Sequence, residues 1–120
     1  MAEEIKSFKE LKIWQKAIAL VKFVYQITQR FPREERYALS DQIRRAAISV
    51  PSNIAEGQAR QHTAEFRQFL FISLGSLAEL GTQLIIAKEL GYINENDLNQ
   101  FDDKSTEFGR MTWTLISRLK

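Results

Sequence analysis

The sequence predicts an all-α protein, an antiparallel four-helix bundle with up-down-up-down connections. Apolar residues recur every three or four positions along most of the 120 residues, and no useful length of chain alternates apolar and polar residues as a strand would. The segments between these patterns are short, which favours antiparallel neighbours. We expect one domain over residues 1–120, in which residues 1–8 form a loose N-terminal tail.

The helix boundaries follow from residues that start and stop helices. The predicted ranges are 9–30, 40–60, 63–90 and 95–119. The Phe31–Pro32 pair ends the first helix, and Gly91 follows the third as a C-terminal glycine. Polar side chains that can accept a capping hydrogen bond precede the other three helices: Ser40, Thr63 and Asn94.

The first helix carries two apolar seams. One seam is Leu11, Trp14, Ile18, Val21, Tyr25 and Thr28, and the other is Ile13, Ala17, Leu20, Val24, Ile27 and Phe31. The seams lie about 110° apart around the helix, whereas a helix of a monomeric bundle needs one apolar stripe. The second seam therefore predicts an oligomer interface, which we place at Ile13, Leu20, Val24 and Ile27.

The second helix has a stripe of mostly small core residues, so a neighbouring helix can approach it closely. These are Ile43, Ala46, Ala47, Val50, Ile54 and Gly57. Pro51 removes a hydrogen-bond donor in the middle, which predicts a kink near Pro51 or a break into two helices. A polar line, Arg45, Ser49, Ser52 and Glu56, has two interpretations. It is a stripe that faces phosphate, or a structural network in which Glu56 pairs with an arginine.

The third helix is apolar nearly all round. Its main stripe is Phe66, Phe69, Ser73, Leu77, Leu80, Leu84 and Ala87, and Ile72 and Ile86 lie on the far side. Burial on all sides is hard to achieve in so short a chain, so this helix favours an oligomer over a monomer with a few exposed apolar residues. The fourth helix has a single stripe and completes the bundle.

Positive charge is concentrated in the first half of the chain. Residues 1–67 carry 12 basic and 8 acidic residues, and residues 68–120 carry 5 and 7, which gives the overall net charge of +2. A belt of basic residues repeated by symmetry in an oligomer would bind nucleic acid through its phosphates. The candidates are Lys12, Lys16, Arg30, Arg33, Arg44, Arg45 and Arg60. The alternative is a solvated face paired with Glu34, Glu35 and Asp41.

The composition argues against catalysis. The chain has no Cys, and His62 is the single histidine, so thiolate nucleophiles and Cys-based metal sites are excluded. Glu56 near His62 and Ser49 near Arg45 form no recognised catalytic motif. We expect no enzymatic activity, no cofactor and no metal. We also expect a cytoplasmic protein without a membrane segment, because no apolar run of ~18 residues and no signal-peptide core are apparent.

Several motifs then resemble one family over residues 8–93. They are FKELKIWQKAIAL at 8–20, RFPREERYALSDQIRRAAISVPSNIAEG at 30–57, FLFISLGSLAELGTQL at 69–84 and LGYI at 90–93. The chain resembles the four helix bundle proteins, many of which are encoded in intervening sequences of bacterial large-subunit ribosomal RNA genes. The resemblance implies a four-helix protomer. Related proteins form homopentameric rings, among them the accessory variability determinant of diversity-generating retroelements, a nucleic-acid-binding partner of a reverse transcriptase.

Two functions stay open at this point. The first is a non-enzymatic accessory protein, by resemblance a homopentamer, which binds RNA or DNA through phosphate contacts. The second is a scaffold for a protein partner such as a reverse transcriptase, in which the charges serve solubility or the choice of partner.

Overall fold

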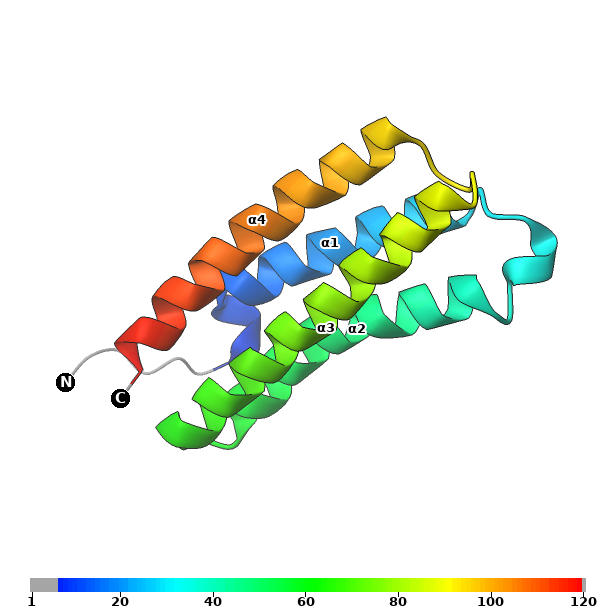
Figure 1. Ribbon diagram of the computed structural model, residues 1–120. Coiled ribbons are helices and arrows are strands. Elements are labelled where there is room, and N and C mark those ends of the chain that lie inside the picture. The colour runs from blue at the N-terminus through cyan, green and yellow to red at the C-terminus, as the bar shows by residue number, and fades with distance from the viewer. Residues whose placement is uncertain (1–6, 120) are drawn as a thin grey trace.

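The computed structural model describes residues 7–119 and forms an elongated bundle of 52 × 24 × 19 Å. Its helices are α1 Lys12–Thr28, α2 Leu39–Ala59, α3 Thr63–Glu89 and α4 Glu95–Arg118, with short 3-10 helices η1 Phe8–Glu10 and η2 Arg33–Glu35. Helices α1 and α3 run in one direction and α2 and α4 in the other (Figure 1), and each packs against two neighbours. The predicted up-down-up-down bundle is confirmed, and the described residues contain no strand.

Two of the predicted helix ends are confirmed in detail. Gly91 has φ +82°, and the amide of Tyr92 donates to the carbonyl of Ala87 at 2.9 Å, which closes the end of α3. Asn94 caps α4 in a capping box, because its side chain accepts from the amide of Asp97 at 2.8 Å and the Asp97 carboxylate accepts from the amide of Asn94.

The other two predicted caps are wrong. Helix α2 begins at Leu39, so Ser40 lies inside its first turn. The amide of Leu39 donates to the carboxylate of Glu35 at 3.3 Å, which takes the place of a side-chain cap from the N-cap residue. Helix α3 begins at Thr63, and its N-cap residue His62 makes no side-chain capping bond.

Small residues let α2 and α3 approach closely, as the sequence predicts. A Cβ atom added to Gly57 would lie 2.5 Å from the Cβ of Phe69, so only glycine fits at this crossing. Farther along, Ser73 is fully buried and its hydroxyl donates to the carbonyl of Val50 at 2.9 Å. Pro51 is buried inside α2, which continues through it as one helix, so the break into two helices is excluded.

The interface predicted on α1 is wrong. The four residues assigned to it are buried within the protomer, with exposed fractions of 4% or less: Ile13, Leu20, Val24 and Ile27. They form the core-facing seam and have no surface to offer a second subunit. The other seam is partly covered by the chain itself: the Phe8 ring packs edge-on against Trp14, and the guanidinium of Arg44 lies 4.4 Å from the ring centre of Tyr25.

The expected loose tail over residues 1–8 is wrong for its last two residues. Residues 1–6 lie outside the described residues, whereas Ser7 caps η1 and Phe8 packs on Trp14.

The expectation that no apolar segment is long enough to span a membrane also needs correction. Helix α3 contains an 18-residue stretch with mean hydropathy 1.7, which by length and composition alone would suffice to cross a membrane. Its inner face packs against α2 and α4, as expected of the central helix of a bundle.

Candidate nucleic-acid interface

The seven basic residues predicted to contact nucleic acid do not form one continuous belt. Four pair with a carboxylate: Lys16 with Glu107 at 3.2 Å, Arg30 with Asp97 at 2.8 Å, Arg45 with Asp41 at 3.0 Å and Arg60 with Glu56 at 3.1 Å. Lys12 is exposed at the start of α1, far from Arg33 and Arg44 beyond its other end. Paired cations retain less attraction for phosphate, so the candidate interface narrows to Arg33 and Arg44.

Arg30 has a structural role that the sequence did not indicate. Its guanidinium reaches from the end of α1 to Asp97, whose side chain is 8% exposed. Burial by itself raises the pKa of Asp97, but the hydrogen bonds from Arg30 and from the amide of Asn94, with the charge of Arg30, lower that pKa below its ordinary value. The carboxylate is therefore held ionised.

The polar line on α2 makes contacts within its own helix. Arg45 pairs with Asp41 one turn earlier, and Ser49 donates to the carbonyl of Ala46 at 2.7 Å. Glu56 pairs with Arg60, which also lies 3.5 Å from Glu65 at the start of α3. These contacts favour the structural interpretation of the line.

A pocket of about 430 Å³ lies where the end of α1, η2 and the start of α2 meet. We call it the arginine pocket, because three arginines line it: Arg33, Arg36 and Arg44. Its other lining residues are uncharged: Thr28, Gln29, Phe31, Pro32 and Ser40. Three guanidinium groups without a carboxylate in the lining make this pocket a candidate site for an anion.

Arg44 is held in place before any ligand arrives. Its Nε donates to the hydroxyl of Thr28 at 2.9 Å, and its guanidinium stacks on Tyr25. Thr28 is itself buried and donates to the carbonyl of Val24 at 2.8 Å. These contacts use Nε and one face of the guanidinium. No hydrogen bond of the described residues engages its two terminal nitrogens, so both remain available to a ligand in the pocket.

The carboxylates nearest in sequence to the arginine pocket have other partners. Glu35 accepts from the amide of Leu39 and, at 2.7 Å, from the hydroxyl of Tyr92. The hydrogen bond to Glu35 raises the pKa of Tyr92 above its ordinary value of 10.0. Asp41 pairs with Arg45, and Glu34 is exposed on η2 outside the pocket lining. The pocket therefore keeps its positive character.

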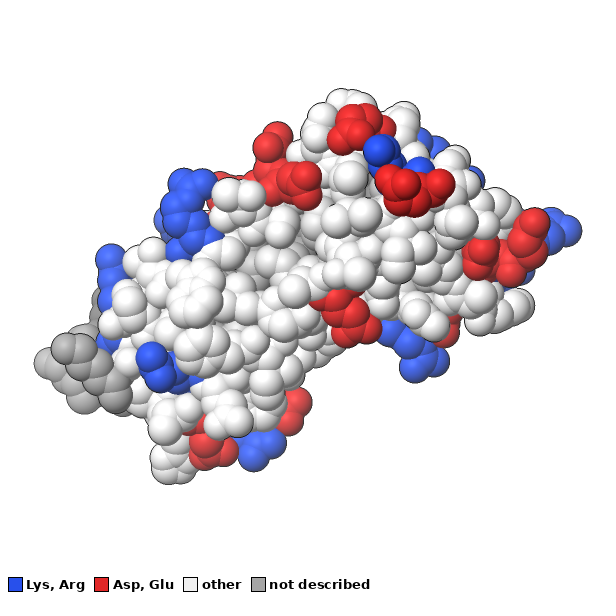
Figure 2. All heavy atoms as spheres, viewed as in Figure 1, with Lys and Arg blue, Asp and Glu red and all other residues white. Residues whose placement is uncertain are grey.

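A second surface is apolar and lies on α3. We call the exposed residues Phe71, Ile72, Ile85 and Ile86 the apolar face of α3; their exposed fractions run from 39% to 52%. Between its two ends the face carries the small residues Gly75, Ala78 and Thr82, and also the exposed Glu79, whose carboxylate accepts from Gln83 at 3.2 Å. Figure 2 shows that the middle of this side of the molecule is largely uncharged. Ile72 and Ile86 are confirmed on the far side of α3.

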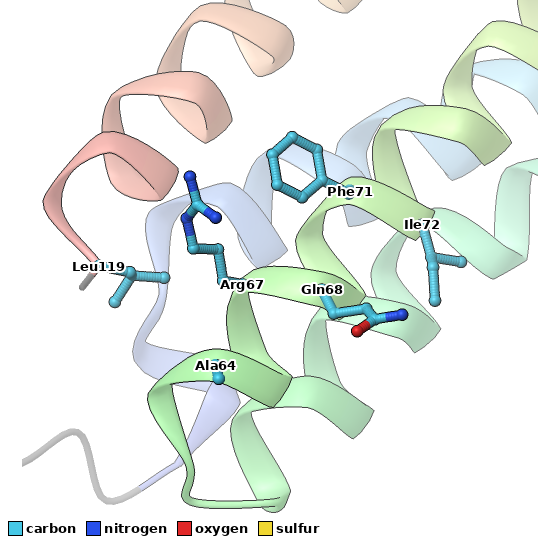
Figure 3. A pocket seen from close by; sticks show the side chains of 6 residues that line it. All are labelled: Ala64, Arg67, Gln68, Phe71, Ile72 and Leu119. Atoms are coloured by element: carbon cyan, nitrogen blue, oxygen red, sulfur yellow. The ribbon is translucent and has the colours of Figure 1, made fainter.

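The exposed apolar surface continues from α3 onto α4. Trp113 is 55% exposed, and its ring lies 5.4 Å from that of Phe71 in an edge-on contact. Nearby, Arg67 extends toward Leu119 at the end of α4, in a pocket also lined by Phe71 and Ile72 (Figure 3). The guanidinium of Arg67 lies 5.4 Å from the Phe71 ring centre. Excess apolar surface thus lies on α3 and α4 and not on α1.

The groups considered for catalysis are not brought together. Glu56 pairs with Arg60, Ser49 donates to a carbonyl of its own helix, and His62 is exposed at the start of α3. Within residues 7–119, no three side chains of the metal-binding types gather in a group that could hold an ion.

Arg36 is the pocket residue that the sequence prediction missed. It belongs to the same cluster of arginines, but nothing in the spacing distinguishes it from its neighbours in a segment that is not a regular helix. The conformation of the Pro32–Ala38 connection brings Arg33 and Arg36 to one pocket with Arg44. The adjacent Tyr37 is 88% exposed.

Comparison with known proteins agrees with this architecture. Residues 9–114 match a family model described as 23S rRNA-intervening sequence protein. The fold is similar to a crystal structure of a protein of unknown function from Bacteroides thetaiotaomicron, described as a member of the S23 ribosomal protein family. That similarity has a TM-score of 0.78 and 22% identity and covers 87% of this chain and 97% of the other, which supports the fold alone. No curated protein matches the chain.

Proposed function

The chain belongs to the family of 23S rRNA-intervening sequence proteins, and from this premise we propose that it is a homo-oligomeric accessory protein that binds nucleic acid through phosphate contacts. The arginine pocket is the observation that carries the proposal. Arg33, Arg36 and Arg44 face one cavity whose lining has no carboxylate. Guanidinium groups bind phosphate through bidentate, charge-assisted hydrogen bonds, and nucleic acid presents a phosphate in every nucleotide.

The apolar face of α3 supports the oligomeric part of the proposal. Four large apolar side chains are exposed on it, and Trp113 extends the patch onto α4. Exposed apolar residues of this kind mark interaction sites, and the small residues between the two pairs, Gly75, Ala78 and Thr82, suit a helix of a second copy. The resemblance to ring-forming relatives favours five subunits. A ring repeats the arginine pocket by symmetry, so that several weak phosphate contacts act together.

Light scattering after size exclusion tests both parts together. We expect a mass of several protomers, near five times 14.0 kDa for the proposed ring, and co-elution with a short structured RNA that weakens steeply as salt rises. A mass near 14.0 kDa without co-elution would contradict both parts.

A paired comparison assigns the RNA contact to the arginine pocket. The double variant Arg33→Gln/Arg36→Gln should weaken RNA binding and lower the salt dependence by about one phosphate contact for each arginine that touches a phosphate. Arg45→Gln is the matched control, because Arg45 neighbours Arg44 but pairs with Asp41 outside the pocket. Equal loss in both variants would indicate a diffuse effect of net charge.

The alternative function is a scaffold for a protein partner. The exposed apolar residues on α3 and α4 favour it, because a partner could cover them in place of a second copy. Two observations together would support the scaffold. The protein alone would be a monomer that binds no RNA at low salt, and it would become oligomeric, or stay soluble at high concentration, only with a protein partner.

A further inference from the structure

The arginine pocket has the charge and shape of a site for the end of a nucleic-acid chain. We infer that it takes a phosphate monoester at a chain terminus in preference to the phosphodiesters within the chain. The inference rests on the proposed function, since it names the chemical group that the same pocket would bind.

Charge is the first argument. A phosphate monoester carries about −1.5 to −2 charges at pH 7 and three terminal oxygens, whereas a phosphodiester carries one charge. The pocket supplies three guanidinium groups from Arg33, Arg36 and Arg44, and its lining has no carboxylate to balance them. A monoester therefore neutralises more of the pocket and offers each arginine an oxygen.

The second argument is a hydroxyl donor in the pocket lining that has no partner among the described hydrogen bonds. Ser40 lines the pocket and is 5% exposed, and none of the hydrogen bonds of the described residues engages its hydroxyl. The hydroxyl is therefore free to donate to a ligand in the pocket. A phosphate oxygen that enters beyond the arginines would accept from Ser40. Ser40 also lies in the first turn of α2, where the helix dipole favours negative charge.

Shape is the third argument. The pocket is a concave space of about 430 Å³ closed on one side by the Phe31–Pro32 turn, which the Tyr92 ring supports at 5.3 Å from that of Phe31. A phosphodiester needs a path for the chain to enter and to leave, whereas a terminal phosphate needs only an entrance. Arg44, already held by Thr28 and Tyr25, gives this space a donor that loses little freedom on binding.

The experiment compares one single-stranded RNA sequence with three ends: a 5′-phosphate, a 3′-phosphate and hydroxyls only. Binding is followed by the anisotropy of an internal label. We expect a phosphorylated end to bind about tenfold more tightly than hydroxyl ends, in line with one or two additional charge-assisted hydrogen bonds. A nucleoside monophosphate should compete at higher concentration.

Variants assign the preference to the pocket. Arg44→Gln and Ser40→Ala should reduce the preference for the phosphorylated end, and Arg45→Gln should keep it. Arg33→Gln/Arg36→Gln gives the same test in an exposed segment, in case Arg44→Gln disturbs the fold. Circular dichroism of each variant verifies folding.

Three outcomes would overturn the inference. Equal affinity for all three RNAs, with loss of binding in the arginine variants, would overturn it and leave the proposed function standing. Binding of none of the RNAs at low salt would overturn the proposed function and the inference with it. A nucleoside monophosphate that binds as tightly as the phosphorylated RNA would show a small-molecule site and not a chain-end site.

Discussion

Arg30 at the end of α1 donates to the buried carboxylate of Asp97 in the first turn of α4, with 2.8 Å between Nη2 of Arg30 and Oδ1 of Asp97. The other oxygen of the same carboxylate accepts from the amide of Asn94. One side chain thus completes a helix cap and joins the first helix to the last. This contact lies at the end of the bundle that also carries the arginine pocket, and it keeps Arg30 as a structural residue.

The variant Asp97→Asn should unfold more readily than the wild type. It removes the charge that Arg30 pairs with and weakens the capping box, which together should cost about 1–3 kcal/mol at pH 7. Urea unfolding at pH 7 measures this difference. Asp103→Asn, an exposed position on the same helix, should stay within about 0.5 kcal/mol of the wild type.

The contribution of Asp97 should also depend on pH. Its pKa in the folded protein lies below the ordinary value of 3.8, so its ionised form contributes stability that is complete above that value. This stability is lost as the pH falls below 3.8 and through the folded pKa. The difference in unfolding free energy between wild type and Asp97→Asn should therefore shrink on acidification. A difference that stays constant down to pH 2 would contradict the assigned shift.

Gly57→Ala should destabilise the protein by about 1–3 kcal/mol, because the added Cβ meets the Cβ of Phe69 at the crossing of α2 and α3. Gly109→Ala is the matched control, since it also replaces a helical glycine, lies in α4 outside the apolar face of α3, and has nothing within 4 Å of the added Cβ. The control should gain about 0.5–1 kcal/mol from helix propensity. Thermal unfolding at a concentration that keeps the oligomeric state constant measures both. If Gly57→Ala lowered the stability no more than the control does, the close approach of α2 and α3 at Gly57 would be refuted.

Ile72→Glu/Ile86→Glu should dissociate the proposed oligomer and leave the protomer folded, because both side chains are 44% exposed on the apolar face of α3. Leu20→Glu should unfold the protomer itself, since Leu20 is 1% exposed in its core. Light scattering gives the mass and circular dichroism the helix content. An unchanged mass in the α3 variant would show that another surface holds the subunits together.

Thr112→Val should stabilise the protein or leave it unchanged, with a gain of up to about 1 kcal/mol. Thr112 is fully buried in α4, and within the described residues its hydroxyl has no hydrogen-bond partner. Valine keeps the shape and removes the unsatisfied oxygen. Thr114→Val, at an exposed position where the hydroxyl donates to the carbonyl of Arg110, should be close to neutral. Destabilisation by Thr112→Val would reveal a partner such as a bound water.

Local patterns predicted the bounds of α2, α3 and α4 to within one residue, whereas the first helix, predicted over 9–30, spans Lys12–Thr28. Periodicity, the C-terminal glycine at Gly91 and the cap at Asn94 are local signals, because each depends on residues within one or two turns. The cap of α2 escaped prediction because Glu35, which accepts from the amide of Leu39, lies in a turn outside the helical pattern. Helix ends that are closed by residues of the same helix were thus predictable, whereas a cap supplied by a residue outside the helical pattern was not.

The sequence by itself determined the fold class, the order of the helices and the existence of more apolar surface than one small bundle buries. Only the tertiary structure decided where that surface lies. Two seams on α1 look alike in sequence, but Leu20 faces the core while Trp14 is covered by Phe8, so the excess falls on Ile72 and Ile86 of α3. Helical periodicity reports which residues share a face and not which neighbour covers that face.

The same distinction holds for the charges. The sequence places most of the arginines in the first half of the chain, and the fold determines which of them have a carboxylate partner. Arg30 meets Asp97 across 67 positions of sequence, whereas Arg33, Arg36 and Arg44 meet one another around a cavity without a carboxylate. A cation's availability to phosphate depends on the nearest carboxylate in space, and that distance is set only when the helices pack.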